Sequence, residues 1–275
     1  MTLIKSISGI RGTIGGKPGE NLTPIDIVEC TTAFGLWINK HHEHAKVVIG
    51  RDGRISGEMV SALVSNTLMS IGIDVIDLGY STTPTVEMAV VFEQAAAGIV
   101  LTASHNPKQW NALKFLNHKG EFISKADGEE LLSYIEAGQL NFAEVDELGS
   151  YVKKEGLIQK HLQAILELKD VDVNKIKESG FKVVVDCINS TGAISIPPLL
   201  DMLGVQYVLL NEELTGDFAH NPEPLPAHLT DLCAAVVRER ADLGISIDPD
   251  VDRLALVDEQ GNLFGEEYTL VAVAD

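Results

Sequence analysis

The sequence predicts an α/β protein built from two consecutive three-layer α/β domains with mixed, mostly parallel sheets. Short runs rich in valine, isoleucine and leucine alternate with segments that carry helix signals, a pattern typical of parallel strands covered by helices on both faces. This pattern repeats after a polar stretch at 141–150. The length of 275 residues also suits two domains of ordinary size. We therefore expect domains at 1–150 and 151–260.

Local signals place the elements of the first domain. Thr23 and Pro24 supply a helix cap and a proline at the first helical position, and the pair Thr83 and Pro84 opens another helix. Apolar, β-branched runs bounded by polar or glycine residues predict the strands. The expected order is helix 23–40, strand 46–50, helix 56–70, strand 74–79, a helix from Thr83 and strand 98–101.

The second domain is expected to repeat this alternation. Its expected elements are helix 156–168, strand 181–188, a helix beyond Gly192, strand 205–210, a proline-rich loop at 219–226, helix 227–240, and strands 243–247 and 254–261. The last residues, GEEYTLVAVAD, have the pattern of a helix without a C-cap glycine or a basic last turn. We therefore expect 261–275 to be the start of a third domain that is cut short.

Composition restricts the classes of function. A formal net charge of −19 argues against binding to nucleic acid or to an anionic membrane surface. Lys5 and Arg11 interrupt the N-terminal segment, which therefore lacks the apolar core of a secretory signal, and no apolar run reaches the length of a membrane span. Cys30, Cys187 and Cys233 lie far apart and indicate reduced thiols. A cytoplasmic location is expected.

An acidic turn follows the apolar run at 243–247. The segment DPDVDR places Asp248, Asp250 and Asp252 at alternate positions, and alternate residues of an extended segment share a face. Carboxylates so close together repel one another unless a cation lies between them, and hard oxygen ligands suit Mg²⁺ or Ca²⁺. Because ligands of open α/β sheets bind outside the carboxyl ends of strands, this turn is a candidate metal site.

Two other interpretations of the turn were considered. Together with the three aspartates, Glu259 matches the spacing of an EF-hand, but Arg253 stands where that loop needs glycine and the flanking residues are strand-like. A solvated acidic loop without a metal remains an alternative. Mg²⁺ is favoured over Ca²⁺ because three carboxylates leave an octahedral ion with open positions, normally filled by water or phosphate oxygens. A phosphorylated group is therefore expected nearby.

Ser104 is the candidate for that group. It follows the strand 98–101 in the irregular segment TASHNP, and phosphoserine would supply a dianionic oxygen ligand that links the two domains through the metal. A hydrolase nucleophile is not favoured, because Thr102 and Asn106 occupy the positions where a nucleophile elbow has glycines. An inert turn serine remains an alternative.

Four motifs together resemble the α-D-phosphohexomutase family. They are GIRG at 9–12, GRDGRISG at 50–57, TASHNP at 102–107 and DPDVDR at 248–253, and they occur in the order expected for that family over nearly the whole chain. Within the family, the segment NPEPLP resembles the bacterial phosphoglucosamine mutases. The resemblance implies a four-domain enzyme that moves phosphate between the 6- and 1-positions of a hexose or hexosamine phosphate. It also implies a phosphoserine enzyme and a bisphosphate intermediate.

The resemblance also implies roles for individual residues. Ser104 would carry the phosphate, and Ser104 with the three aspartates of the acidic turn would hold one Mg²⁺. Arg11, Arg253 and Lys114 would contact phosphate oxygens. His105 and Lys114 would serve in proton transfer and charge stabilisation, and Arg11 would also be a catalytic residue. These roles agree with the chemistry of phosphoryl transfer, which depends on positioning and on neutralising phosphate oxygens. Arginine offers phosphate a planar fork, and histidine titrates near neutrality.

This sequence departs from the family pattern in two respects. Ala112 stands where the family usually has glycine, so we expect a different backbone path to Lys114. The signatures of the third and fourth domains, which bind the sugar hydroxyls and the distal phosphate, do not occur in these residues. We therefore expect a poorly active fragment. A phosphoglucomutase or phosphomannomutase, a noncatalytic metal-binding module and a Ca²⁺ sensor remain alternatives.

Three further motifs have more than one interpretation. His41, His42 and His44 lie near a helix end, where cationic side chains are common, although weak metal binding is the alternative. In RDGRISG, charged residues can either position the active-site loops or simply form a turn. Those charged residues are Arg51, Asp52 and Arg54. The rigid loop at 221–224 is expected to support the site rather than take part in chemistry.

Overall fold

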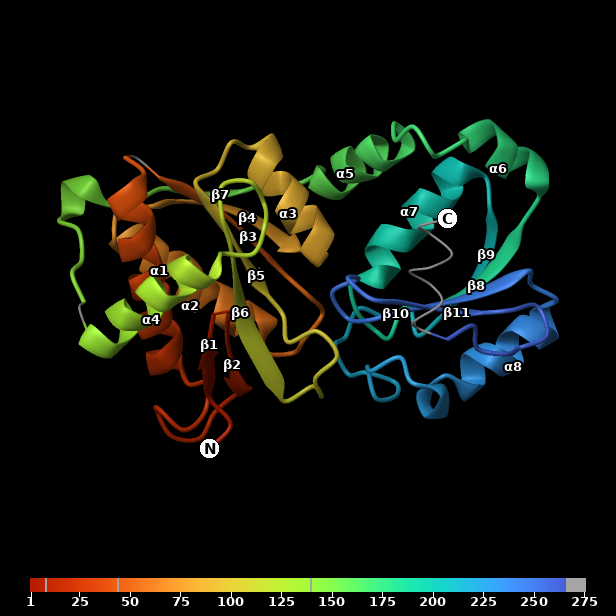
Figure 1. Cartoon of the computed structure of the whole chain (residues 1–275), viewed down its shortest axis with the longest axis horizontal. Coiled ribbons are helices and arrows are strands. Elements are labelled where there is room, and N and C mark those ends of the chain that lie inside the picture. Colours follow the sequence, from red (N-terminus) through yellow and green to blue (C-terminus); the bar gives the residue numbers. More distant parts are fainter. Residues whose placement is uncertain (8, 44, 139, 266–275) are drawn as a thin grey trace. The chain divides into compact units, whose positions relative to one another are not determined.

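A computed structural model of the chain describes residues 1–7, 9–43, 45–138 and 140–265. The chain forms two compact units (Figure 1). The first unit comprises Met1–Arg51, Ile55–Ala103 and Gln109–Leu157. The second comprises the residues from Ile158 onward together with two short segments, Asp52–Arg54 and Ser104–Lys108. Two loops that leave strands of the first unit therefore make most of their contacts within the second.

The first unit contains a seven-stranded mixed sheet with the order β1-β2-β6-β5-β3-β4-β7. Strands β5, β3, β4 and β7 are parallel, whereas β6, β2 and β1 join the sheet through antiparallel pairs. The elements are β1 (Ile4–Ser6), β2 (Gly9–Thr13), α1 (Pro24–His41), β3 (Lys46–Arg51), α2 (Gly57–Ser70), β4 (Asp74–Tyr80), α3 (Thr83–Phe92), β5 (Ala97–Leu101), β6 (Trp110–Leu116), α4 (Lys125–Ala137) and β7 (Tyr151–Lys153).

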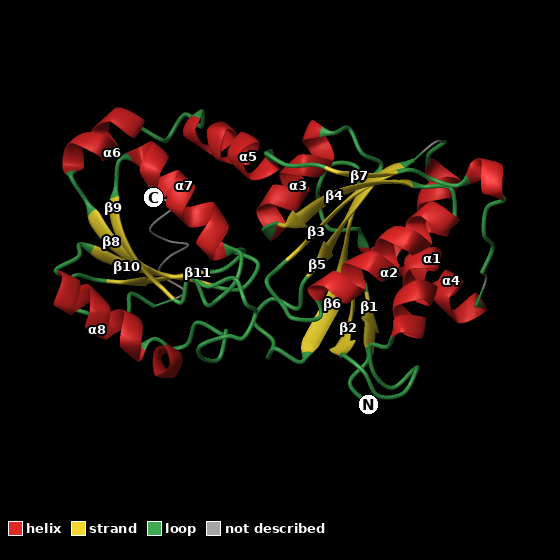
Figure 2. Ribbon diagram, turned by 180° about the vertical axis from the view of Figure 1, so that it is seen from behind, coloured by secondary structure: helices red, strands yellow, loops and turns green. Residues whose placement is uncertain are grey.

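Alternate residues of β3 pack in two different hydrophobic cores, one on each face of the sheet. Val47 and Ile49 pack in the core that α1, α2 and α4 cover, and Val48 packs in the core beneath α3. This follows from strand geometry, because successive side chains point to opposite faces. Figure 2 shows the helices on both sides of the sheet. Burial on both faces explains why the strand reads as a continuous apolar run rather than as an alternating one.

The second unit contains a four-stranded sheet with the order β11-β10-β8-β9, in which only β11 is antiparallel to its neighbour among the described strands. Val183 and Val185 of β8 pack beneath α7, whereas Val184 packs beneath α8. The elements are α5 (Leu157–Leu166), α6 (Val173–Ser179), β8 (Lys182–Asp186), α7 (Gly192–Leu203), β9 (Gln206–Leu210), α8 (Thr230–Glu239), β10 (Leu243–Ile247) and β11 (Leu254–Val257).

These units confirm the predicted α/β fold class with mixed sheets. The sequence analysis did not identify the antiparallel strands β1, β2 and β6, or α4, α6 and β7. The expected change of backbone path at Ala112 is not seen, because Ala112 and Lys114 lie within the strand β6. Ala112 pairs with Arg11 of β2 and has no positive φ, so alanine in place of glycine requires no different path. Most of the expected third-domain segment 261–275 lies outside the described residues.

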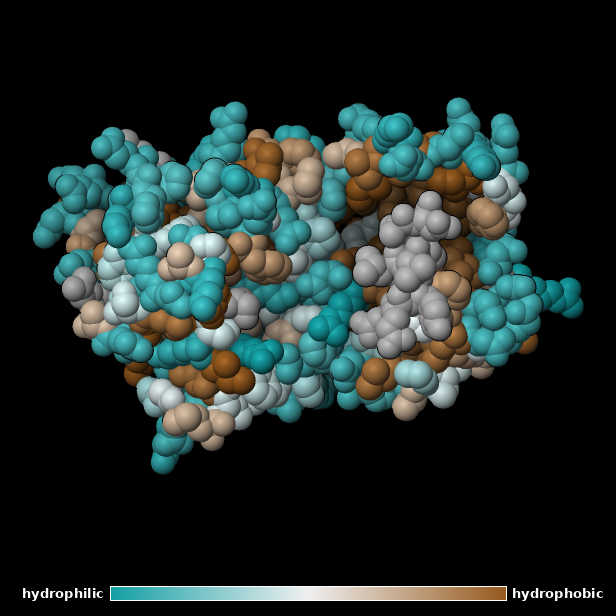
Figure 3. All heavy atoms as spheres, in the orientation of Figure 1, coloured by the Kyte–Doolittle hydropathy of each residue, from teal (hydrophilic) through white to brown (hydrophobic). Residues whose placement is uncertain are grey.

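The surface of the first unit is largely hydrophilic on the face seen in Figure 3, with smaller apolar areas between the charged side chains. This agrees with the large negative net charge. Within the described ranges, no helix is both long and apolar enough to cross a bilayer.

Candidate metal and phosphoserine site

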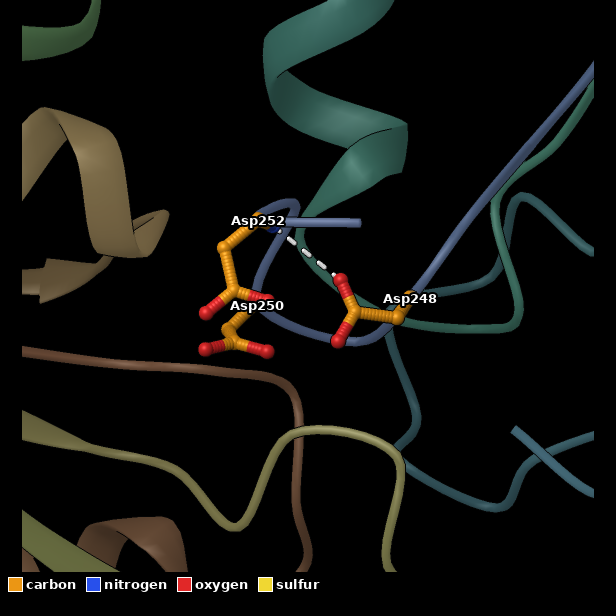
Figure 4. A group of neighbouring side chains, drawn as sticks. All are labelled: Asp248, Asp250 and Asp252. Atoms are coloured by element: carbon orange, nitrogen blue, oxygen red, sulfur yellow. Dashed lines mark hydrogen bonds between the residues drawn. The ribbon is translucent and has the colours of Figure 1, made fainter. Parts of the chain in front are cut away.

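The acidic turn joins β10 to β11 and brings three carboxylates together (Figure 4). Ligand atoms of Asp248, Asp250 and Asp252 all lie within 4.8 Å of one another. Asp248 and Asp250 are fully buried, whereas Asp252 is exposed. The turn follows the carboxyl end of a parallel strand, which is the edge where ligands of such sheets bind. Strands flank the turn on both sides, so its context differs from the helices of an EF-hand.

A tight turn, rather than strand alternation, causes this convergence. Val251 adopts a left-handed backbone conformation with φ 62°, and the backbone N–H groups of Asp252 and Arg253 both donate to Oδ1 of Asp248 at 3.1 Å. The extended segment assumed from the sequence is therefore wrong as an explanation, although the three carboxylates do meet. Asp248 is therefore both a candidate metal ligand and the residue whose Oδ1 holds the turn closed.

The electrostatics of the turn favour a divalent cation. Burial and the neighbouring carboxylates of Asp250 and Asp252 raise the pKa of Asp248 far above its usual range. The donor set consists entirely of carboxylate oxygens, which are hard ligands suited to Mg²⁺. Positive charge placed among these groups would relieve the repulsion that raises this pKa. The residues present therefore fit the metal that the resemblance implies.

Ser104 lies against this acidic turn within the second unit. Its Oγ donates a hydrogen bond to Oδ2 of Asp248 at 2.6 Å. The residue is only 8% exposed and adopts a left-handed conformation with φ 48°, which is uncommon for serine. The hydroxyl oxygen of Ser104 is thus in hydrogen-bond contact with Asp248, one of the three carboxylates that would hold a cation. The serine and the acidic turn, which lie 144 residues apart in sequence, thus form one site.

The guanidinium of Arg54 holds the serine loop in this conformation. It donates to the carbonyl oxygens of Ser104, Asn106 and Pro107 at 2.5, 2.7 and 2.8 Å, and it forms an ion pair with Asp52 at 3.0 Å. Both members of this ion pair are fully buried. Of the two functions considered for RDGRISG, this geometry supports the positioning of the loop by Asp52 and Arg54. Arg51 is not part of this arrangement and instead stacks on Tyr80.

Ser190 connects the segment at Gly53 to the acidic turn. Its Oγ accepts a hydrogen bond from the backbone N–H of Gly53 at 2.9 Å and donates to the carbonyl oxygen of Pro249 at 2.6 Å. Thr191 donates to the same carbonyl at 2.8 Å. The sequence analysis missed both hydroxyl residues. Their position just after the strand β8, at the same sheet edge as the acidic turn, was the available signal.

His105 and Arg253 also belong to the second unit, as does Ser104. Nδ1 of His105 lies 3.4 Å from Oγ of Ser104. Burial, followed by the positive charge of Arg253, lowers the pKa of His105 below its ordinary value. The imidazole is therefore neutral near pH 7, the state in which it can accept a proton.

Arg11 and Lys114 belong to the first unit. Arg11 lies in β2 opposite Ala112 of β6, and Lys114 is two residues further along β6, so the three side chains share one face of the sheet. Nζ of Lys114 lies 5.9 Å from the ring centroid of Phe122. Two of the three cations predicted for phosphate binding, Arg11 and Lys114, thus lie on adjacent strands.

Other histidines lie near the end of α1 and in the proline-rich loop of the second unit. His42 lies beside His118, with ring centroids 6.0 Å apart, and His44 lies outside the described residues. Among the described residues, no cluster of three metal-ligating side chains forms around this pair. In the loop that contains NPEP, Nε2 of His220 lies 2.8 Å from Oδ2 of the buried Asp186, at the carboxyl end of β8. This pair ties the loop to the sheet, in agreement with a supporting role.

Comparison with known families matches both halves of the chain. Residues 3–142 match the model of phosphoglucomutase/phosphomannomutase α/β/α domain I, and residues 159–261 match that of domain II. Among curated relatives, a phosphoglucomutase/phosphomannomutase of Thermococcus kodakarensis is 36% identical over 96% of this chain and 58% of its own length. A phosphoglucosamine mutase of Sulfurovum is 30% identical over 96% of this chain and 59% of its own length.

Solved structures show the same fold. A phosphoglucomutase/phosphomannomutase family protein of Burkholderia thailandensis matches with a TM-score of 0.83 and 26% identity, over 98% of this chain and 58% of that one. The chain thus spans somewhat more than half the length of the relatives that it matches.

Proposed function

Because the chain belongs to the phosphoglucomutase/phosphomannomutase family, we propose that it carries the phosphoserine and metal-binding part of a phosphohexomutase. The reaction is the reversible transfer of phosphate between the 6- and 1-positions of a hexose or hexosamine phosphate. A phosphoserine enzyme and a bisphosphate intermediate connect the two positions. The observation that carries this proposal is the 2.6 Å hydrogen bond from the Ser104 hydroxyl to Asp248 of the acidic turn.

Each residue of the site has a role that its geometry supports. Ser104 carries the phosphoryl group, and transfer breaks the bond between phosphorus and Oγ while a new bond forms to a hydroxyl oxygen of the sugar. The neutral imidazole of His105 accepts the proton of that hydroxyl. Arg253 stands beside these groups and offers a guanidinium to the phosphate oxygens, a geometry that arginine matches well.

The metal proposed for the acidic turn is Mg²⁺. Asp248, Asp250 and Asp252 would hold it, with an oxygen on Ser104 as a further ligand. A bound Mg²⁺ supplies neutralisation of the negative charge on phosphate oxygens. Arg11 and Lys114, on adjacent strands of the first unit, would add positive charge for the sugar phosphate.

The preferred substrate class is a hexosamine phosphate, as for phosphoglucosamine mutase. The segment NPEPLP and the match to relatives with that name support this choice, while phosphoglucomutase or phosphomannomutase activity is the second candidate. Relative rates with glucosamine, glucose and mannose 6-phosphates, each with its own 1,6-bisphosphate as activator, separate the two candidates. A clear preference for glucose or mannose phosphate would overturn the assignment to hexosamines.

Intact-mass measurement tests the phosphoserine proposal directly on this chain. Incubation with Mg²⁺ and glucosamine 1,6-bisphosphate should add the mass of one phosphoryl group, and Ser104→Ala should abolish the addition. Ser133→Ala, which changes an exposed serine of α4, should leave it unchanged. Absence of phosphorylation together with retained Mg²⁺ binding would favour a noncatalytic metal-binding module. We also expect slow mutase turnover by these 275 residues alone, and a normal rate would contradict that expectation.

A further inference from the structure

A cavity with several charged side chains in its wall lies entirely within the first unit. It has a volume of about 460 Å³ and is bounded by α2, the ends of β3 and β4, and the edge strand β7. This volume is within the range of about 300–1,000 Å³ that is typical of small-molecule sites. Its lining includes Arg51, Glu58, Ser61, Asp77, Tyr151 and Lys153. None of these residues belongs to the acidic turn or to the serine loop.

Two cations of this cavity are available to a ligand. The guanidinium of Arg51 stacks on the ring of Tyr80, with 3.9 Å from Cζ to the centroid, which fixes its position without neutralising its charge. Lys153 extends past Gly79, where an added Cβ would lie 3.7 Å from Cε of the lysine. In the described part of the chain, neither cation forms an ion pair. Two cations on the wall of one cavity, neither of them neutralised by an ion pair there, indicate an anionic ligand.

The same cavity presents groups that can accept hydrogen bonds from the hydroxyls of a ligand or donate hydrogen bonds to them. Asp77 is 9% exposed, and its two oxygens accept hydrogen bonds from the Tyr151 hydroxyl at 2.8 Å and from the Gly79 N–H at 2.7 Å. These bonds fix the carboxylate at the wall of the cavity and leave lone pairs for a further donor. Glu58, on the exposed side of α2, and the hydroxyl of Ser61 complete this polar lining.

We propose that this cavity binds a small hydroxylated phosphate monoester, with Arg51 and Lys153 holding the phosphate and Asp77 and Glu58 accepting hydroxyl hydrogen bonds. A bare cation is disfavoured by the two positive side chains, and a purely apolar ligand by the charged side chains of the lining. The site is separate from the one proposed for phosphoryl transfer, because the two share no residue. The inference therefore does not depend on the proposed mutase activity.

NMR titration of the 275-residue chain tests this proposal, with amide signals as the readout. Glucose 6-phosphate should shift the amide signals of Gly79, Tyr151 and Lys153 together along one binding curve. Glucose should leave these signals unmoved, and inorganic phosphate should shift them only at concentrations at least tenfold higher. Equal affinity for inorganic phosphate would overturn the assignment to a hydroxylated ligand. Absence of shifts at these residues would overturn the site itself.

Variants distinguish this site from binding elsewhere. Arg51→Gln and Lys153→Gln should each weaken the binding curve at Gly79 at least tenfold. Lys125→Gln, which changes an exposed lysine of α4, is the matched control and should have no effect. Arg253→Gln should alter only binding seen at the acidic turn. Equal effects of the control, or loss of the Gly79 response in Arg253→Gln, would overturn the proposal. Because Lys153 lies on an exposed edge strand, its variant keeps the test valid if Arg51→Gln does not fold.

Discussion

The guanidinium of Arg54 donates a hydrogen bond to the backbone carbonyl oxygen of Ser104 at 2.5 Å, across 50 residues of sequence. Ser104 has a positive φ, a conformation that costs of the order of 1–3 kcal/mol when the surroundings must impose it. The buried arginine supplies that constraint, since it also binds the carbonyl oxygens of Asn106 and Pro107 in the same loop. The orientation of the serine hydroxyl toward Asp248 therefore depends on a residue that is itself far from solvent.

Replacement of Arg54 by alanine should destabilise the protein strongly. The change leaves the buried carboxylate of Asp52 without its ion-pair partner, and breaking a buried pair typically costs about 3–5 kcal/mol. Urea unfolding measures this loss. Arg238→Ala, which removes an exposed arginine paired with Glu239, is the control and should cost less than about 1 kcal/mol. Similar losses in the two variants would contradict the role assigned to Arg54.

The Asp250→Asn substitution should have opposite effects on the stability of the protein without and with a bound metal. It removes charge repulsion from the metal-free acidic turn, but it also removes a metal ligand. Without divalent cations, this variant should be more stable than the parent by about 1 kcal/mol or more, because each pKa unit relieved at Asp248 corresponds to about 1.4 kcal/mol. With Mg²⁺ at about 100 times its dissociation constant, the parent should gain about 2.7 kcal/mol and the variant much less.

Thermal unfolding with Mg²⁺ and with EDTA measures both effects on the acidic turn. Asp170→Asn, in an exposed turn, should behave like the parent under both conditions. A parent protein whose unfolding temperature does not respond to Mg²⁺ or to any other divalent cation would refute the metal site. A larger response to Ca²⁺ in the presence of excess Mg²⁺ would refute the choice of metal.

The pair of His220 and Asp186 should make stability depend on pH. Burial lowers the pKa of His220, but the hydrogen bond and charge of Asp186 outweigh this effect, so the pKa is raised overall. A raised histidine pKa contributes stability that is fully present below about pH 6.5 and is lost as the pH rises through the folded-state value. Burial also opposes ionisation of Asp186, but hydrogen bonds from His220 and Asn211 lower its pKa overall.

The stability of a His220→Gln variant relative to the parent measures this contribution. The free energy lost on substitution should be larger at pH 5.5 than at pH 8.5, since the charged pair exists only at the lower value. The contribution of Asp186 is present at both of these pH values and disappears only in stronger acid. A substitution cost that is equal at the two pH values would show that Asp186 does not raise the pKa of His220.

The ionisation of His105 should respond to Arg253. Burial and the nearby guanidinium lower the pKa of this imidazole, so removal of the positive charge in Arg253→Gln should raise it. NMR titration of the His105 ring protons, without divalent cations, measures the shift. His228, which hydrogen-bonds to the backbone of Glu223, provides an internal comparison in the same spectra. An unchanged His105 titration would show that burial alone accounts for its neutral state.

Helices and parallel strands were predictable because their signals are local. Thr23 accepts a hydrogen bond from the N–H of Asp26, and Pro24 follows at the first helical position, as the sequence indicated. The antiparallel strands β2 and β6 were missed for a physical reason. Gly9 has φ 135°, and an added Cβ would lie 2.5 Å from the carbonyl oxygen of Leu113, so the glycine-rich motif permits a close approach of two strands that no local pattern reveals.

The types of residue in the candidate site could be predicted from the sequence, but the contacts that hold these residues in place could not. Three aspartates and a serine were identifiable because like charges and a loop hydroxyl at strand ends are unusual in sequence. Their convergence, however, depends on the left-handed conformation of Val251, which a β-branched residue adopts only where surrounding contacts impose it. The hydrogen bonds of Ser190 to Gly53 and Pro249 are likewise invisible in a linear sequence, because their partners lie 137 and 59 residues away.

The sequence by itself determined the α/β class, the order of most elements and the kinds of ligand atom available, because periodicity, capping and charge are properties of neighbouring residues. Only the tertiary structure decided that Arg54 holds the serine loop, that the loop and the acidic turn belong to one compact unit, and that Arg51 and Lys153 share a cavity. These relationships depend on burial and on contacts between distant segments, which arise only when the chain packs.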